Sequence, residues 1–222
     1  MKLSILTLLL TVSGITTIFA QNNTPADKEA YTKMITERSA KIVANLGIND
    51  TKKTEKVTGI IRDQYSALND IYAARDIRVK EIKEKNKDNK VERDSALAKD
   101  GRKVDAALAK QHNKYISKLS SQLSAEQVNL VKNGMTYNVL PITYKAYQEE
   151  ILTLTEDQKK QILIWLTEAR EHAMDAESSD KKHAWFGKYK GRINNYLSAA
   201  GYDLKKEGAE WEKRRKAKTE SN

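Results

Sequence analysis

The chain has 222 residues, enough for one or two domains with a hydrophobic core, and a formal net charge of +10 at pH 7. It contains no cysteine, which excludes disulfide bonds, thiol chemistry and the lipidated cysteine of a bacterial lipoprotein. Acidic and basic residues are interleaved along the chain, so the charge is more typical of a solvated helical surface than of a nucleic-acid interface.

Residues 1–20 have the pattern of a secretory signal peptide. Lys2 is positively charged, residues 3–19 are largely apolar, and Ala20 is a small residue at the expected cleavage site. The segment is short for a membrane anchor, and no other stretch is long and apolar enough to cross a bilayer. Exported eukaryotic domains of this size usually carry disulfides. We therefore expect a bacterial protein that is periplasmic or secreted and has no transmembrane segment.

A first unit is predicted over residues 21–134. It begins with a helix over residues 25–46, where proline and an acid occupy the first turn. Asp50 or Thr51 then caps the first helix of a long helical hairpin. The asparagines of residues 86–89 are the best place for the hairpin turn. The far part of the hairpin is mostly charged, which predicts a polar, projecting arm.

Residues 135–153 are predicted to connect two units. Pro141 disfavours helical geometry at the residue before it, so residues 137–142 are expected to be extended. A short helix is expected over residues 144–151. A second candidate surface in this connector consists of Tyr137, Tyr144 and Tyr147, although a packed crossover between units explains them better.

A second unit is predicted over residues 154–216. Thr155 caps its first helix in an arrangement close to a capping box. A return helix follows over residues 185–197, a last helix covers residues 202–216, and residues 217–222 are expected to form a disordered tail.

The second unit repeats part of the first. At one constant spacing, Tyr115, Leu119, Leu123 and Gly134 recur as Tyr189, Ile193, Leu197 and Gly208. An earlier block recurs at a larger spacing: Val57, Ile60 and Ala67 return as Leu163, Leu166 and Ala173. The difference between the spacings places an insertion in the first unit. The predicted fold is therefore all-α, with two unequal antiparallel helix pairs in a bundle and a long projecting hairpin.

Signals for catalysis are poor. The three histidines, His112, His172 and His183, lack the four-residue spacing of a helical zinc site. No glycine-rich phosphate loop occurs, and no carboxylate stands in a context that predicts a raised pKa. The sequence therefore predicts no cofactor and no metal site.

Residues 183–197 carry the densest group of aromatic and polar side chains. The ligand-binding candidates are Trp185, Lys188, Tyr189, Arg192, Asn195 and Tyr196 from this segment, together with Trp165 from the preceding helix. One interpretation is a platform on which sugar rings or aromatic groups stack. The other is close helix packing, in which Tyr189 only matches core Tyr115. Gly187 and Gly191 each weaken a helix by about 1 kcal/mol, which predicts a close contact with their backbone.

Residues 154–158, 165–171 and 183–197 resemble a family of exported, uncharacterised helical proteins of bacteroidete-type Gram-negative bacteria. The resemblance implies an all-helical fold behind a signal peptide. Some members are described as sugar-binding proteins encoded near polysaccharide-degradation genes, and no catalytic residues come with the family. The helix starts at residues 123–127 and 154–158 also resemble the Leu-Thr-x-x-Gln motifs of the Spy/CpxP periplasmic chaperones.

Three hypotheses of function follow. The first is a non-catalytic extracytoplasmic protein that binds a carbohydrate at the face from Trp185 to Tyr196. The second is a Spy-like holdase or interaction protein that binds polypeptides or a second copy through its arm, residues 75–110. The third is a carbohydrate-active enzyme. No nucleic-acid partner is expected.

Overall fold

The computed structural model describes residues 25–220, which consist of helices joined by short turns. The helices are α1 (Pro25–Val43), α2 (Thr51–Lys85), α3 (Lys90–Ser120), α4 (Ala125–Met135), α5 (Val139–Glu150), α6 (Glu156–Met174), α7 (Ser179–Ala199) and α8 (Leu204–Glu220). These residues contain no β-strand, which confirms the all-α prediction. The predicted signal peptide, residues 1–20, lies outside the described part of the chain.

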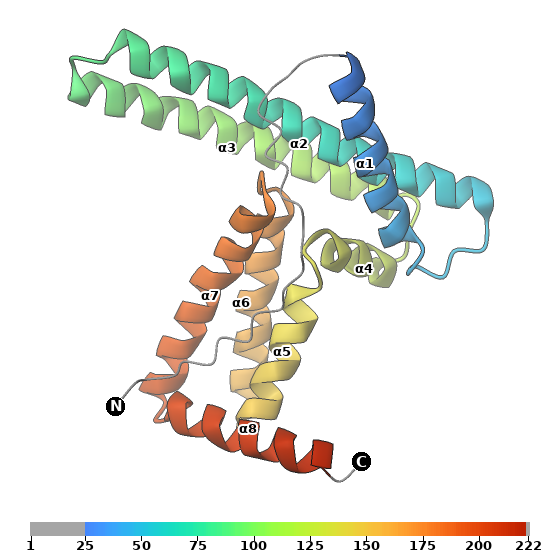
Figure 1. Cartoon of the computed structure of the whole chain (residues 1–222), viewed down its shortest axis with the longest axis vertical. Helices are drawn as coiled ribbons and strands as arrows, with labels where there is room; N and C mark the ends of the chain where they lie inside the picture. The colour runs from blue at the N-terminus through green and yellow to red at the C-terminus, as the bar shows by residue number, and fades with distance from the viewer. Residues whose placement is uncertain (1–24, 221–222) are drawn as a thin grey trace.

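The helices form two units with the same packing order (Figure 1). In the first unit α2 packs along α3, α1 packs on α2 and α4, and α4 also contacts α3. In the second unit α6 packs along α7, α5 packs on α6 and α8, and α8 also contacts α7. Helix α5 therefore occupies the place in the second unit that α1 occupies in the first.

Each unit has its own hydrophobic core. The first core is built from apolar stripes of α1 to α4, with buried members that include Ile35, Val43, Val57, Ile61, Tyr115, Leu119 and Val131. The second is built from α5 to α7, with buried members that include Ile151, Ile162, Leu166, Phe186, Ile193 and Leu197. Met174, the last residue of α6, packs in the first core. The end of α6 thus enters the first unit.

The predicted long hairpin is present. Helices α2 and α3 have 35 and 31 residues, whereas α6 and α7 have 19 and 21. Asp50 caps α2 and Asn89 caps α3, each by accepting a backbone N–H bond. Along the projecting part, Arg78 Nε donates to Asp100 at 2.6 Å, and this carboxylate is buried. Figure 1 shows the hairpin extending well past the rest of the molecule.

The expected extended connector is wrong. Tyr137 and Asn138 form a tight turn with φ of 57° and 56°, and α5 begins directly afterwards at Val139. Pro141 lies in the first turn of α5, where a backbone N–H has no helical partner and its loss costs little. Leu140 stays helical before the proline because its side chain is buried in the second core.

Two further expectations need correction. Helix α8 continues past the predicted end at Lys216 to Glu220, so residues 217–220 are helical and do not form a disordered tail. Gly187 and Gly191 are exposed, and a Cβ added to either would meet no atom within 4 Å. Nothing in residues 25–220 packs against their backbone. None of the helices described is long and apolar enough to span a membrane.

Alanine substitutions at three helical glycines should separate packing from helix propensity. A Cβ on Gly134 would lie 3.0 Å from two side-chain atoms of buried Ile42, so Gly134→Ala should lower the free energy of unfolding by about 1 kcal/mol. Gly187→Ala and Gly191→Ala meet open space and should each raise it by about 0.5–1 kcal/mol. Urea denaturation measures all three, and equal effects at the three positions would contradict the packing described.

Candidate functional site

A row of aromatic rings follows the seam between α6 and α7. The row consists of Trp165 and His172 from α6 and Trp185, Tyr189 and Tyr196 from α7, all partly exposed or exposed. His172 stacks on Trp185 with ring centroids 4.3 Å apart, and Trp165 meets Tyr196 edge-on at 5.2 Å. Spacings of four and seven residues on two antiparallel helices put these rings in line. We call this set the aromatic row.

Basic side chains cover both indoles of the aromatic row. Lys188 Nζ lies 5.1 Å from the centroid of Trp185, and the guanidinium of Arg192 lies 4.5 Å from that of Trp165. Arg192 also forms an ion pair with Glu168 at 3.7 Å. Partial burial, and next Glu168, raise the pKa of Tyr189. The cations therefore lie over the rings themselves.

Most of the sequence-predicted candidates lie together, but one does not join the rest. Trp165, Trp185, Lys188, Tyr189, Arg192 and Tyr196 all belong to the aromatic row or contact it. Asn195 is exposed and makes none of these contacts. Tyr189 is half-buried, whereas its repeat partner Tyr115 is fully buried. Core packing alone therefore does not account for Tyr189.

One end of the aromatic row opens into a cleft between the two units. The cleft has a volume of about 740 Å³. Its lining comes from α2, α3, α6 and α7: Tyr72, Arg75, Gly101, Val104, Asp105, Leu108, Ala109, His112, Asn113, Glu171, His172, Asp175 and Trp185. Of the predicted ligand-binding residues, only Trp185 lines this cleft.

The two walls of the cleft differ in chemistry. Helix α3 contributes apolar Val104 and Leu108 together with polar Asp105. The opposite wall, from α6 and α7, has the stacked rings of His172 and Trp185 together with Glu171 and Asp175. Sequence reasoning missed the α3 wall because nothing in the chain shows that α3 faces α7. It also missed His172, although the seven-residue spacing from Trp165 puts both on one helical face.

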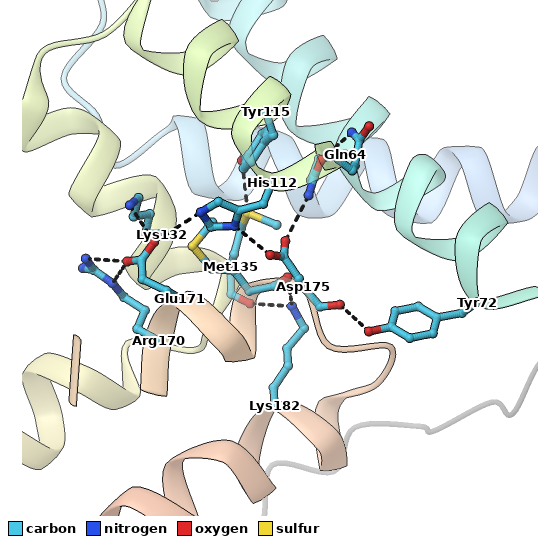
Figure 2. A network of polar contacts seen from close by, with 12 residues as sticks. Gln64, Tyr72, His112, Tyr115, Lys132, Met135, Arg170, Glu171, Asp175 and Lys182 are labelled. Carbon is cyan, nitrogen blue, oxygen red and sulfur yellow. Dashed lines mark hydrogen bonds and ion pairs between the residues drawn. The ribbon is translucent and has the colours of Figure 1, made fainter. Parts of the chain in front are cut away.

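Asp175, at the end of α6, joins the units at the base of the cleft (Figure 2). Its carboxylate accepts hydrogen bonds from Gln64 Nε2 at 3.2 Å and from His112 Nδ1 at 2.6 Å. Its backbone oxygen accepts from the Tyr72 hydroxyl at 2.7 Å. An ionised carboxylate only accepts, so Nδ1 of His112 carries the proton. One residue of the second unit is thus held by three side chains of the first.

Glu171 also takes part in the contact between the units. We call the polar contacts of Asp175 and Glu171 the junction. It accepts from Lys132 Nζ at 2.7 Å and pairs with Arg170 at 3.1 Å. The Nε2 atom of His112 lies 3.6 Å from the same carboxylate. The hydrogen bond to Asp175 is the main cause that raises the pKa of His112, against the opposing effect of burial. His112 therefore lies between two acids, which stabilise its charged form.

The side chains that line the cleft are better suited to binding a ligand than to acid–base catalysis. Its carboxylates Glu171 and Asp175 are engaged by cations and donors of the junction. Burial raises the pKa of Tyr72 to about 12, which makes its hydroxyl a donor rather than a base. No cluster of three or more histidine, aspartate or glutamate side chains within residues 25–220 is arranged to hold a metal ion.

A model of one protein family matches most of the chain. A family model described as a protein of unknown function, DUF3826, matches residues 32–217, which include parts of all eight helices described above. No curated protein matches the chain.

The junction should make stability depend on pH through His112. Because its folded-state pKa is raised above the ordinary 6.5, the stabilisation is full below that value and is lost as pH rises through the raised pKa. The free energy of unfolding should therefore fall as the pH rises above 6.5, and His112→Gln should reduce the slope of that fall. Urea denaturation at several pH values measures the slope.

A matched variant is His183→Gln, since His183 is exposed on α7 and lies outside the junction. It should keep the slope of the parent protein. An unchanged slope in His112→Gln would show that the junction does not depend on the charge of that histidine.

Proposed function

We propose that this chain, which belongs to the DUF3826 family of proteins of unknown function, is an exported, non-catalytic carbohydrate-binding protein. The observation that carries the proposal is the cleft of about 740 Å³ between the α2–α3 hairpin and the α6–α7 pair, with Trp185 in its wall. Export rests on the signal-peptide pattern of residues 1–20 alone.

The lining of the cleft suits a sugar. The C–H face of a sugar ring is apolar and packs on an indole, whereas its hydroxyl groups need donors and acceptors on both sides. Trp185 supplies the ring face, and Arg75, Asp105 and Asn113 supply polar groups around it. A volume of this size accommodates one or a few sugar units.

The binding site we propose is the Trp185 end and not the whole aromatic row. At the other end, Arg192 covers Trp165 and is itself paired with Glu168, so a ligand would have to displace both. Lys188 also lies over Trp185, but no carboxylate holds it in the structure of residues 25–220. Its long side chain can swing away at small cost.

The other two hypotheses receive less support. A holdase needs a contiguous apolar surface, yet the large hydrophobic side chains that are clearly exposed on the arm are Ile77 and Val91. A glycosidase needs a free acid beside a free carboxylate. Two of the carboxylates in the cleft instead belong to the junction that joins the units.

Removing the indole of Trp185 should weaken carbohydrate binding. We expect Trp185→Ala to lower the affinity for a glycan found on an array by about tenfold or more, since a ring face of the ligand loses its partner. Isothermal titration calorimetry with that glycan measures the change, and analysis of the glycan after incubation shows whether it is cleaved.

Trp211→Ala is the matched control. Trp211 is also partly exposed and lies under an arginine, Arg215, but it belongs to α8 and not to the cleft. It should leave the affinity unchanged. Failure of every glycan to bind, or equal losses in the two variants, would contradict the proposal, and cleavage of the glycan would favour the enzyme.

A further inference from the structure

A second hollow lies on the other side of the α6–α7 turn, between that turn and helices α1, α2 and α4. It consists of an outer chamber of about 500 Å³ and an inner chamber of about 190 Å³. Both chambers are lined by Met34, Arg38, Tyr65 and Tyr137, so they adjoin. We call the two chambers together the α1 pocket. It is separate from the cleft, although Tyr72 lines both the cleft and the inner chamber.

Three cations line the α1 pocket. Arg38 and Lys41 lie at the outer chamber, and Lys182 lies at the inner one. None of the three takes part in an ion pair among the described residues. Of the two acids in the lining, Glu177 is paired with Arg75 at 2.5 Å, which leaves Glu37 at the outer chamber. Positive charge is therefore in excess here.

Lys182 is buried and forms no ion pair with a carboxylate among the described residues. Its Nζ donates to the backbone oxygen of Met135 at 3.2 Å (Figure 2) and to that of Met174 at 3.1 Å. An ammonium group has three donor protons, so one remains for a ligand in the inner chamber. Burial lowers the pKa of Lys182 to about 8, and an anion beside it would offset that desolvation.

The walls of the α1 pocket are aromatic. Tyr65 lies with its ring 5.6 Å from the guanidinium of Arg38, and Tyr31 donates to the backbone oxygen of Tyr65 at 3.2 Å. Tyr137 reaches the pocket from the left-handed turn before α5. Such a turn costs about 1–2 kcal/mol per residue for most side chains. This unfavourable backbone conformation occurs at Tyr137, whose side chain lines both chambers.

We infer that the α1 pocket binds a small molecule in which a six-membered ring carries a carboxylate. The inner chamber has room for the carboxylate beside Lys182, and the outer chamber has room for the ring between Arg38, Tyr65 and Tyr137. A planar guanidinium matches a carboxylate with two parallel hydrogen bonds. The inference is independent of carbohydrate binding in the cleft.

Calorimetric titrations of the folded protein test the inference. The probes are glucuronate and benzoate, a sugar acid and an aromatic acid, with glucose as the neutral counterpart of glucuronate and inorganic phosphate as a second anion. We expect at least one of the two carboxylates to bind, and the tighter one identifies the kind of ring. Glucose and phosphate should bind at least tenfold more weakly than that acid.

Variants assign the binding to the pocket. Arg38→Gln changes an exposed side chain and should lower the affinity for the bound acid by at least tenfold. Arg62→Gln removes an arginine of α2 that pairs with Asp63 outside the pocket, and it should have no effect. Lys182→Met should abolish binding, and a melting curve first establishes that this variant is folded.

Several results would overturn the inference. These are no heat with either acid, binding of glucose or phosphate as tight as that of the acid, and an Arg38→Gln variant that binds like Arg62→Gln. Because the cleft contains neither Arg38 nor Lys182, loss of this binding is distinguishable from loss of glycan binding through Trp185.

Discussion

Asp175 holds the two units together, because both its carboxylate and its backbone oxygen accept hydrogen bonds from the first unit. Met174 beside it is buried in the core of that unit. The α6–α7 turn is thereby held against the first unit. Both hollows border this contact, since the cleft lies between the end of α6 and α3, and the inner chamber of the α1 pocket lies between the turn and α1.

The polar character of the junction has a structural consequence. Apart from Met174, the buried apolar side chains of each unit pack in that unit's own core. Directional bonds to Asp175 and Glu171 therefore add most of the specific contacts that orient one unit against the other. Partly buried charges of this kind add little net stability but are costly to leave unpaired, which penalises other arrangements. The shape of both hollows therefore depends on a few charged side chains.

The local features of the fold follow from the sequence. Thr155 forms the capping box that its spacing to Gln158 predicts. Most apolar side chains of the predicted stripes in α2 and α6 are buried or half-buried, although Leu163 is exposed. The predicted start of α5 was wrong. The steric preference against helical geometry before a proline is weaker than the stabilisation from burying Leu140 in the second core. The capping box depends on contacts near in sequence, whereas the helical conformation of Leu140 depends on packing against residues distant in sequence.

The candidate site could be predicted only in part, for a different reason. The face of Trp185 and Tyr189 is set by the period of one helix, so the sequence indicates it. The opposite wall, with Val104 and Asp105, depends on how the hairpin lies across the second unit. Lys182 carries no local sign of burial, since its neighbours Lys181 and His183 are exposed. Contacts between the two units cannot be predicted from the pattern of a single sequence segment.

The exposed glycines of α7 affect how this helix moves. Gly187 and Gly191 have no side chains to shield the backbone hydrogen bonds from water, and the unfolded segment gains entropy from both. Helix α7 therefore depends on Phe186, Ile193 and Leu197 to hold it against α6. Local opening and amide hydrogen exchange are expected to be faster in α7 than in α6, whose middle has no glycine. A ligand that bridges the two helices at Trp185 would slow that exchange.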